Sequence, residues 1–414
     1  MIFGGTGRGT DGGAHDFSPF FRPQMNDPAD ILANFDFGPR PRIVFGVDAV
    51  DRIGSLAGEL GGRRVLVVSD AGVVAAGHAP RAIEQLVAAG LETCLFDGVA
   101  ENPTTEDIQR IMVAARDFQP DLLVGLGGGS SMDSAKGVNF LVSNGGRIQD
   151  YWGVGKATRP MLPMIAVPTT SGTGSETQSF ALISDVKTHV KMACGDRKAT
   201  CRVALLDPKL TLTQPPRVTA MTGIDALSHA LETFVTKRRT AISLAFSREA
   251  WVLLEANFPR VLAAPYDLKA RAGMQLGASL AGLAIENSML GAAHALANPL
   301  TAHYRLPHGE AIGLMLPHVI RFNSPRVGEA YGELLGMVAG SNGAPAAKTG
   351  AAGLADFIAS LVEKAGLPRS LSDRGIPRDQ FPRLAAEAAT QWTGQFNPRP
   401  LDQDELLRLY EAAH

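Results

Sequence analysis

Short apolar runs alternate with longer helical patterns through the first half of this 414-residue chain. The runs have the length of buried strands, and the segments between them carry apolar residues at helical spacing. Strands separated by helices form parallel sheets, because each crossover returns the chain to the same end of the sheet. The sequence therefore predicts a parallel sheet with strands at 43–45, 64–68, 93–96, 121–126, 164–167 and 203–206 and helices at 49–60, 79–89, 105–118 and from residue 130.

The strand signals end near Pro208, Pro215 and Pro216. Beyond these prolines, apolar residues recur at helical spacing with small residues among them, which predicts an all-α second domain. The first residues are rich in glycine and proline without periodicity, so we expect an irregular arm there. The expected organisation is an N-terminal arm at 1–35, an α/β domain at 36–213 and a helical domain at 214–414.

Charge and hydropathy exclude several classes of protein. The 39 Lys and Arg residues nearly balance 41 Asp and Glu residues, so the net charge of −2 offers no field that attracts nucleic acid or an anionic membrane. With 45% hydrophobic and 19% charged residues, the chain is too apolar to be disordered. The most apolar stretch, 273–300, is interrupted by Gln275, Glu286 and Asn287 and predicts a pair of buried helices.

The cysteine content bears on the cellular compartment. Cys94, Cys194 and Cys201 are an odd number without a Cys-x-x-Cys pair, which indicates neither a disulfide framework nor a cysteine zinc site. The N-terminal residues lack a charged segment followed by the apolar run of a secretory signal. We therefore expect a protein of the reducing cytoplasm.

A glycine cluster follows the strand expected at 121–126. Gly127, Gly128 and Gly129 precede Ser130, which we expect to cap the next helix. Free backbone N–H groups at the positive end of a helix dipole bind phosphate well. The pattern is neither Gly-x-Gly-x-x-Gly nor a P-loop, so a purely structural turn remains an alternative.

Two further segments favour a nucleotide. Asp70 lies just beyond the carboxyl end of the strand at 64–68, where a carboxylate can accept both ribose hydroxyls of adenosine and would repel a 2′-phosphate. An Asp at this place can also serve only as a helix cap. Residues 168–176 form a run of hydroxyls and glycines after another expected strand, which suits close approach to a ligand but is also compatible with an ordinary loop.

The helical half carries a possible metal site. Asp225 and His229 are four residues apart and so lie on one helix face. His294 lies in an apolar helical segment, and His308 lies at an element boundary marked by proline and glycine. A surface pair and buried core histidines are the alternative interpretations of the separate parts. Together these four side chains would complete a site for a divalent ion.

At this point the sequence resembles the iron-containing (group III) alcohol dehydrogenase family through several ordered motifs. The resemblance covers residues from about 40 to 414. It implies a dinucleotide-binding α/β domain with a parallel sheet, a helical domain, and a cleft across which cofactor and metal face each other. The motifs are Gly-Gly-Gly-Ser-Ser-Met-Asp at 127–133, the loop at 168–176, the Asp-Ala-Leu-Ser-His-Ala-Leu-Glu helix at 225–232, the spacing between His294 and His308, and Asn-Pro-Arg-Pro at 397–400.

The resemblance also implies roles for individual residues. Asp225, His229, His294 and His308 would bind the metal, and His308 would also lie beside the nicotinamide. The cofactor residues would be Asp70 and Asn102 at the adenosine, Gly128, Gly129 and Ser130 at the pyrophosphate, and Thr169, Thr170 and Lys191 nearer the reactive end.

Three departures from the family pattern bear on the chemistry. Asn298 stands where many relatives carry a histidine, and an amide cannot relay a proton as imidazole does, so the proton would leave through water, a ribose hydroxyl or another histidine such as His303. Gln178 replaces a small hydroxyl residue near the cofactor. The segment at 391–396 is bulkier than in enzymes that oxidise short alcohols.

These observations predict an NAD-dependent alcohol dehydrogenase or aldehyde reductase in which a divalent metal acts as a Lewis acid on the substrate oxygen. Three imidazoles and a carboxylate suit Fe(II) and Zn(II), and the family favours iron. One alternative is a metal-free reductase like maleylacetate reductase, which residues 41–46 also resemble. A second is an inactive nucleotide-binding protein. By resemblance we expect a homo-oligomer, a dimer, and a small alcohol or aldehyde as substrate.

Overall fold

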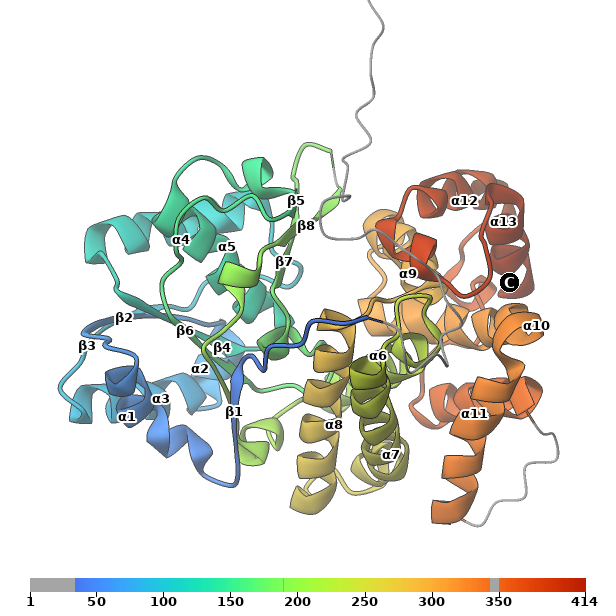
Figure 1. Cartoon of the computed structure of the whole chain (residues 1–414), viewed down its shortest axis with the longest axis horizontal. Coiled ribbons are helices and arrows are strands. Elements are labelled where there is room, and N and C mark those ends of the chain that lie inside the picture. Colours follow the sequence, from blue (N-terminus) through green and yellow to red (C-terminus); the bar gives the residue numbers. More distant parts are fainter. Residues whose placement is uncertain (1–33, 189, 343–349) are drawn as a thin grey trace, which may run out of the picture.

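The computed structural model describes residues 34–188, 190–342 and 350–414. Two halves lie side by side, a sheet flanked by helices and a cluster of helices (Figure 1). The arm expected at 1–35 lies outside the described residues except at its last two positions, which have no regular structure.

The main sheet has six parallel strands in the order β1-β9-β6-β4-β2-β3. All six strands lie where the apolar runs predict them. Because helices cover both faces, the central strands are buried on both sides and read as continuous apolar runs. Their bounds are Arg42–Phe45 (β1), Arg64–Val68 (β2), Glu92–Phe96 (β3), Leu122–Gly127 (β4), Met164–Pro168 (β6) and Val203–Leu206 (β9).

Alternate residues of each strand pack against helices on opposite faces. Val65 and Val67 join the core with α1 and α3, whereas Leu66 and Val68 join the core with α4 and α5. These layers are seen on the two sides of the sheet in Figure 1. The helices of this half are Ile53–Glu59 (α1), Ala71–Ala75 (α2), His78–Ala88 (α3), Thr105–Phe118 (α4) and Gly129–Asn144 (α5).

A second, three-stranded sheet was not expected from the sequence. It has the order β5-β8-β7, formed by Gly153–Val154 (β5), Phe180–Ser184 (β7) and Lys191–Gly195 (β8). β7 and β8 are antiparallel. The apolar run of β7 was missed in the sequence, whereas β8 begins with a lysine and continues with small residues, so its apolar pattern is weak.

The second half of the chain is all-helical, as predicted. Its central helix is α6, in which Ile224, Leu227 and Leu231 are fully buried in the largest hydrophobic core. The pair expected at 273–300 corresponds to α8 and α9. None of the described helices is long and apolar enough to cross a membrane. The helices are Pro216–Val235 (α6), Ala241–Ala263 (α7), Leu268–Glu286 (α8), Ala292–Tyr304 (α9), His308–Asn342 (α10), Gly350–Lys364 (α11), Phe381–Ala389 (α12) and Gln403–Ala412 (α13).

Candidate metal and cofactor site

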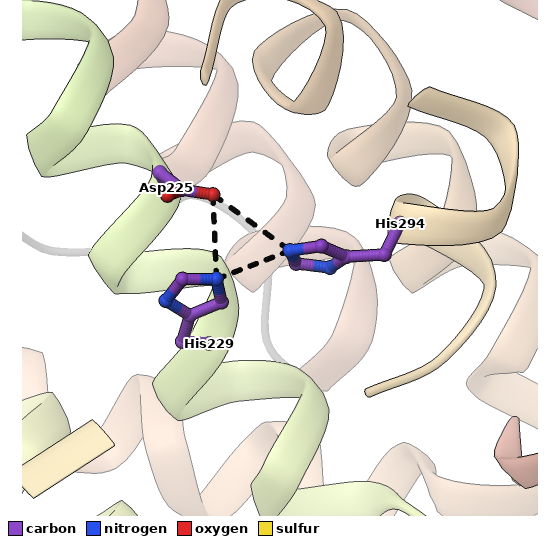
Figure 2. Close-up of side chains that lie close together, drawn as sticks. All are labelled: Asp225, His229 and His294. Atoms are coloured by element: carbon purple, nitrogen blue, oxygen red, sulfur yellow. Dashed lines mark hydrogen bonds and ion pairs between the residues drawn. The ribbon is translucent and has the colours of Figure 1, made fainter. Parts of the chain in front are cut away.

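The four predicted metal ligands come together from three helices. Asp225 and His229 lie one turn apart on α6, His294 lies near the start of α9, and His308 is the first residue of α10. Figure 2 shows the side chains of Asp225, His229 and His294 pointing toward one another between α6 and α9. The close approach of α9 and α10 to α6 therefore assembles a group that is widely separated in sequence.

The imidazoles surround one carboxylate oxygen. Oδ1 of Asp225 lies 3.4 Å from Nε2 of His229, 3.7 Å from Nε2 of His294 and 3.7 Å from Nε2 of His308. The Nε2 atoms of His229 and His294 are 3.1 Å apart. Three of these side chains are buried, while the side chain of His308 keeps 23% exposure. The group is thus open to ligands on the side of His308.

These residues fit a divalent cation. Among the described residues, no hydrogen bond satisfies Oδ1 of Asp225, although this oxygen is buried. A buried, unpaired carboxylate oxygen is costly unless a cation or donor reaches it. One hard oxygen and three imidazole nitrogens are donors that suit Fe(II) or Zn(II). The buried cluster of Asp225, His229 and His294 accordingly has the geometry of a metal site.

Glu232 orients one of the imidazoles and was missed in the sequence. Its Oε2 lies 2.6 Å from Nδ1 of His294, and its Oε1 accepts a hydrogen bond from the backbone N–H of Ala293 at 2.7 Å. A carboxylate behind Nδ1 holds the proton there and leaves the Nε2 lone pair for a metal. Spacing offers a signal, because Asp225, His229 and Glu232 lie at positions i, i+4 and i+7 of one helix face.

The charge state of the cluster suits metal binding. Burial alone would raise the pKa of Asp225, but the imidazoles around it, His229 first, lower it below its ordinary value. Burial lowers the pKa of His308 to about 3, which keeps this ring neutral, the form that binds metals. Burial opposes the charge of His294, yet the carboxylate of Glu232 raises its pKa to about 9. The carboxylates of Asp225 and Glu232 therefore favour a positive charge between them, on the ring of His294 or on a bound cation.

The turn at the start of α5 requires glycine at two positions. Gly127 has φ of 147°, a backbone conformation that favours glycine, and a Cβ on Gly129 would lie 2.7 Å from Cγ2 of Thr173. Gly128 is the N-cap, and no side chain caps the helix. The expectation that Ser130 is the cap is therefore wrong: α5 begins at Gly129, and Oγ of Ser130 instead accepts a hydrogen bond from the backbone N–H of Asn102 at 3.2 Å. The N–H groups at this helix end have no side-chain acceptor, as a phosphate site requires.

The residues expected at the adenosine lie beside this turn. Oγ of Ser131 donates to Oδ2 of Asp70 at 3.3 Å, and Asn102 reaches the turn through Ser130. Oδ1 of Asp70 also accepts from the N–H of Val73 at 3.0 Å, so the carboxylate caps α2 as well. Asp70 and the turn follow β2 and β4, the neighbouring strands between which the strand order reverses. Ligands of open α/β sheets bind at such a switch point.

The third group of predicted residues lies between the turn and the metal cluster. The backbone N–H of Thr169 donates to the carbonyl of Gly127 at 2.9 Å, and Thr170 lies close to Gly128. Lys191 starts β8, and its pKa is lowered by burial against the attraction of Asp133 and Asp225.

The residues that depart from the family pattern make other contacts. Nδ2 of Asn298 donates to Oε1 of Gln391 at 2.9 Å, and Nε2 of Gln178 donates to the carbonyl of Thr173 at 2.8 Å. His303 is exposed and pairs with Glu387 of α12 at 2.5 Å. The structure therefore brings Asn298 within one helical turn of His294, whereas His303 lies on the surface formed by α9 and α12.

Comparison with known proteins agrees with this geometry. The family model described as iron-containing alcohol dehydrogenase matches residues 39–208, and the model of the C-terminal part of the Fe-containing alcohol dehydrogenase family matches residues 219–414. The NAD-dependent methanol dehydrogenase of Bacillus methanolicus is 33% identical over 90% of this chain and 98% of that protein.

Two solved structures extend the similarity to three dimensions. A 1,3-propanediol oxidoreductase superimposes with a TM-score of 0.88 at 30% identity, over 92% of this chain and all of the other. The sulfoacetaldehyde reductase of Bifidobacterium kashiwanohense, solved with NAD+, has a TM-score of 0.82 at 28% identity, over 92% of this chain and 99% of the other. Each match spans both the sheet and the helical half.

Proposed function

The chain belongs to the iron-containing alcohol dehydrogenase family, and we propose that Asp225, His229, His294 and His308 are the metal ligands with which it oxidises alcohols and reduces aldehydes. It is an NAD-linked alcohol dehydrogenase or aldehyde reductase, with NAD and iron as cofactors. The observation that carries the ligand assignment is the buried Oδ1 of Asp225, which has three imidazole nitrogens within 3.7 Å.

The protein contributes to the reaction by positioning the metal ligands. A divalent ion held by the four side chains would supply Lewis acidity toward the substrate oxygen. His229 and His294 are held by burial, and Glu232 fixes the ring of His294, so the donors are preorganised. We assign His308 a second task, because its partly exposed ring is the ligand from which a substrate and the nicotinamide can both be contacted.

We propose that the cofactor extends along the sheet edge toward the metal. Asp70 and Asn102 would hold the adenosine, Gly128, Gly129 and Ser130 the pyrophosphate, and Thr169, Thr170 and Lys191 the nicotinamide half. The contacts among Asp70, Ser131, Ser130 and Asn102 support the first two groups. A carboxylate at the ribose favours NAD over NADP because it repels a 2′-phosphate.

Proton transfer is assigned differently from relatives with an imidazole at position 298. We propose that Asn298 orients Gln391 near the metal and that the proton leaves through water or a ribose hydroxyl, since an amide neither gains nor loses a proton in the useful range. His303 is unsuited to this step because it is paired with Glu387 on the surface.

The proposal also covers the domain bounds, the oligomeric state and the cellular compartment. The domains would be 36–213 and 214–414. The protein would be a homodimer, for which the edge strand β1, with Phe45 42% exposed, offers a surface. It would reside in the cytoplasm, as the free thiols of Cys94, Cys194 and Cys201 suggest. Light scattering of the purified protein tests the dimer.

The assay that tests the function is a panel of primary alcohols and aldehydes. The protein would be loaded anaerobically with Fe(II) or Zn(II) and assayed with NAD and NADP by nicotinamide absorbance. We expect metal-dependent turnover that prefers NAD. Turnover that is unaffected by complete removal of metal would contradict the metal site and favour a metal-free reductase.

A further inference from the structure

An aromatic pair joins the two halves of the molecule. The ring of Phe180 on β7 stacks on Trp392 of the 3-10 helix η9 (Trp392–Phe396), with centroids 5.6 Å apart and planes inclined by 28°. Phe396 meets the same indole edge-on at 6.1 Å. Trp392 is therefore held between two aromatic rings, one from each half.

The register of β7 and β8 shows which way Phe180 points. Paired residues of an antiparallel ladder point to the same face, so Phe180, which pairs with Gly195, shares a face with Lys191, which pairs with Ser184. The opposite face carries Ala181 and is buried in the core. The shared face, which carries Phe180 and Lys191, is therefore turned away from that core.

Trp392 is fixed from the other side. Its neighbour Gln391 accepts the hydrogen bond from Asn298, which lies one turn beyond His294 on α9. Gly394 of η9 packs closely on Ala295, the residue after His294, since a Cβ at Gly394 would lie 3.4 Å from that of Ala295. Both anchors of η9 are thus on the helix that supplies a metal ligand.

The pair therefore joins β7 to the segment that packs on α9, the helix that carries His294. Phe180 and Trp392 are both only half-buried, so part of their apolar surface remains exposed beside this helix. We propose that this aromatic wall, Phe180 and Trp392, contacts the part of the substrate beyond the reacting carbon and selects alcohols and aldehydes with an apolar tail. This inference rests on the proposed function.

Two substrates of equal size that differ only at the tail test the effect of its polarity. 1-Butanol and 1,3-propanediol have the same number of non-hydrogen atoms and differ in a terminal methyl or hydroxyl group. An apolar wall gains from the methyl group and leaves the hydroxyl without a partner. We expect kcat/KM for 1-butanol to exceed that for 1,3-propanediol by about tenfold or more. Equal efficiencies, or a preference for the diol, would overturn the proposal.

Variants locate the selectivity. Trp392→Gln and Phe180→Asn should each lower the butanol-to-propanediol ratio toward one. The matched control is Phe246→Leu on α7, which removes a half-buried ring whose centroid lies 5.8 Å from that of Phe37, with the two planes inclined by 56°. The control should keep the ratio of the unchanged protein. A ratio that is the same in all four proteins would assign selectivity to other residues and overturn the proposal.

A binding measurement separates this inference from the proposed function. Butanamide and 3-hydroxypropanamide resemble the two aldehydes but do not react, and calorimetry measures their binding to the complex with metal and NADH. Tighter binding of butanamide that is lost in Trp392→Gln supports the wall even if no alcohol is oxidised. Turnover of alcohols together with equal binding of both amides in all proteins overturns the wall and leaves the function intact.

Discussion

Oε2 of Glu232 lies 2.6 Å from Nδ1 of His294, while Nε2 of the same ring lies 3.7 Å from Oδ1 of Asp225. One imidazole thus links a carboxylate outside the metal cluster to a carboxylate inside it. Since both carboxylates are buried, the ring has little freedom to turn. Its orientation is set before a metal arrives.

Glu232→Gln is expected to weaken metal binding without removing a ligand. The amide can still accept from the N–H of Ala293, but its NH2 group would face Nδ1–H of His294, so the ring loses its acceptor. We expect the metal dissociation constant to rise about 10- to 100-fold. Competition with a chelator measures it. The control is Glu405→Gln, which alters an ion pair with Arg399 outside the cluster. Unchanged affinity in Glu232→Gln would show that packing alone orients the ring.

Removing a ligand should abolish stable metal binding. Asp225→Ala and His294→Ala leave at most three protein donors and open the site to water, so metal content and turnover should both fall. NAD affinity should survive in both, because the glycine turn before α5 is in the other half of the molecule. Elemental analysis and NAD titration provide the two measurements. Folded variants with full metal content and turnover would rule out this ligand set.

Much of the fold follows from local patterns. The six strands of the main sheet have apolar runs that are visible in the sequence, because burial on both faces requires them. The pairing of β7 with β8 has no such signal, because it depends on a sheet that only the folded chain creates. The cap of α5 differs by two residues from the expected Ser130, because the helix already begins at Gly129 and no side chain caps it.

The sequence predicts the part of the site that lies on a single helix. The spacing of Asp225 and His229 on α6 indicates a shared face, whereas the meeting of His294 and His308 with them depends on how α9 and α10 pack. The sequence offers both histidines as candidates, and the family resemblance then implies that they are ligands. The stacking of Phe180 on Trp392 has no counterpart in the motifs, because it joins residues more than two hundred positions apart.

Cofactor preference should depend on the charge of Asp70. Asp70→Asn keeps a side-chain oxygen that can cap α2 at Val73 but removes the negative charge. A unit charge near a phosphate is worth about 1 to 4 kcal/mol, so the NADP-to-NAD ratio of kcat/KM should rise by about tenfold or more. Steady-state kinetics with both cofactors measures the ratio. If the unmodified protein used NAD and NADP equally well, the proposal that Asp70 contacts the adenosine ribose would be wrong.

Asn298→His tests the proton path. An imidazole at this position can titrate near neutral pH, whereas the amide cannot. We expect the pH dependence of kcat to change more than the metal content, because the side chain of Asn298 donates its hydrogen bond to Gln391 and is not one of the four proposed metal ligands. Asn298→Gln is the control, since it keeps an amide. Identical pH profiles for all three proteins would mean that position 298 only packs.

The buried amine of Lys136 connects the cofactor helix to the loop before β7. Its Nζ donates to the carbonyl and Oγ of Ser175 at 2.6 and 2.9 Å and to the carbonyl of Phe180 at 2.9 Å, and it lies 3.9 Å from Asp133. The side chain is fully buried. Asp133 in turn accepts from Oγ of Ser175 and from the N–H of Leu182. This arrangement ties α5 to the start of β7.

Lys136→Met should therefore destabilise the protein strongly. It leaves two carbonyls without this donor and removes the cation beside a buried carboxylate, a change that costs about 3–5 kcal/mol in free energy of unfolding. Urea denaturation measures the loss, and Asp133→Asn combined with Lys136→Met should recover part of it, because no uncompensated charge then remains. Since Thr173 of the same loop packs against Gly129 of the phosphate turn, NAD should also bind more weakly in Lys136→Met. A variant with unchanged unfolding energy and unchanged NAD affinity would show that the loop is held by its packing against α8 alone.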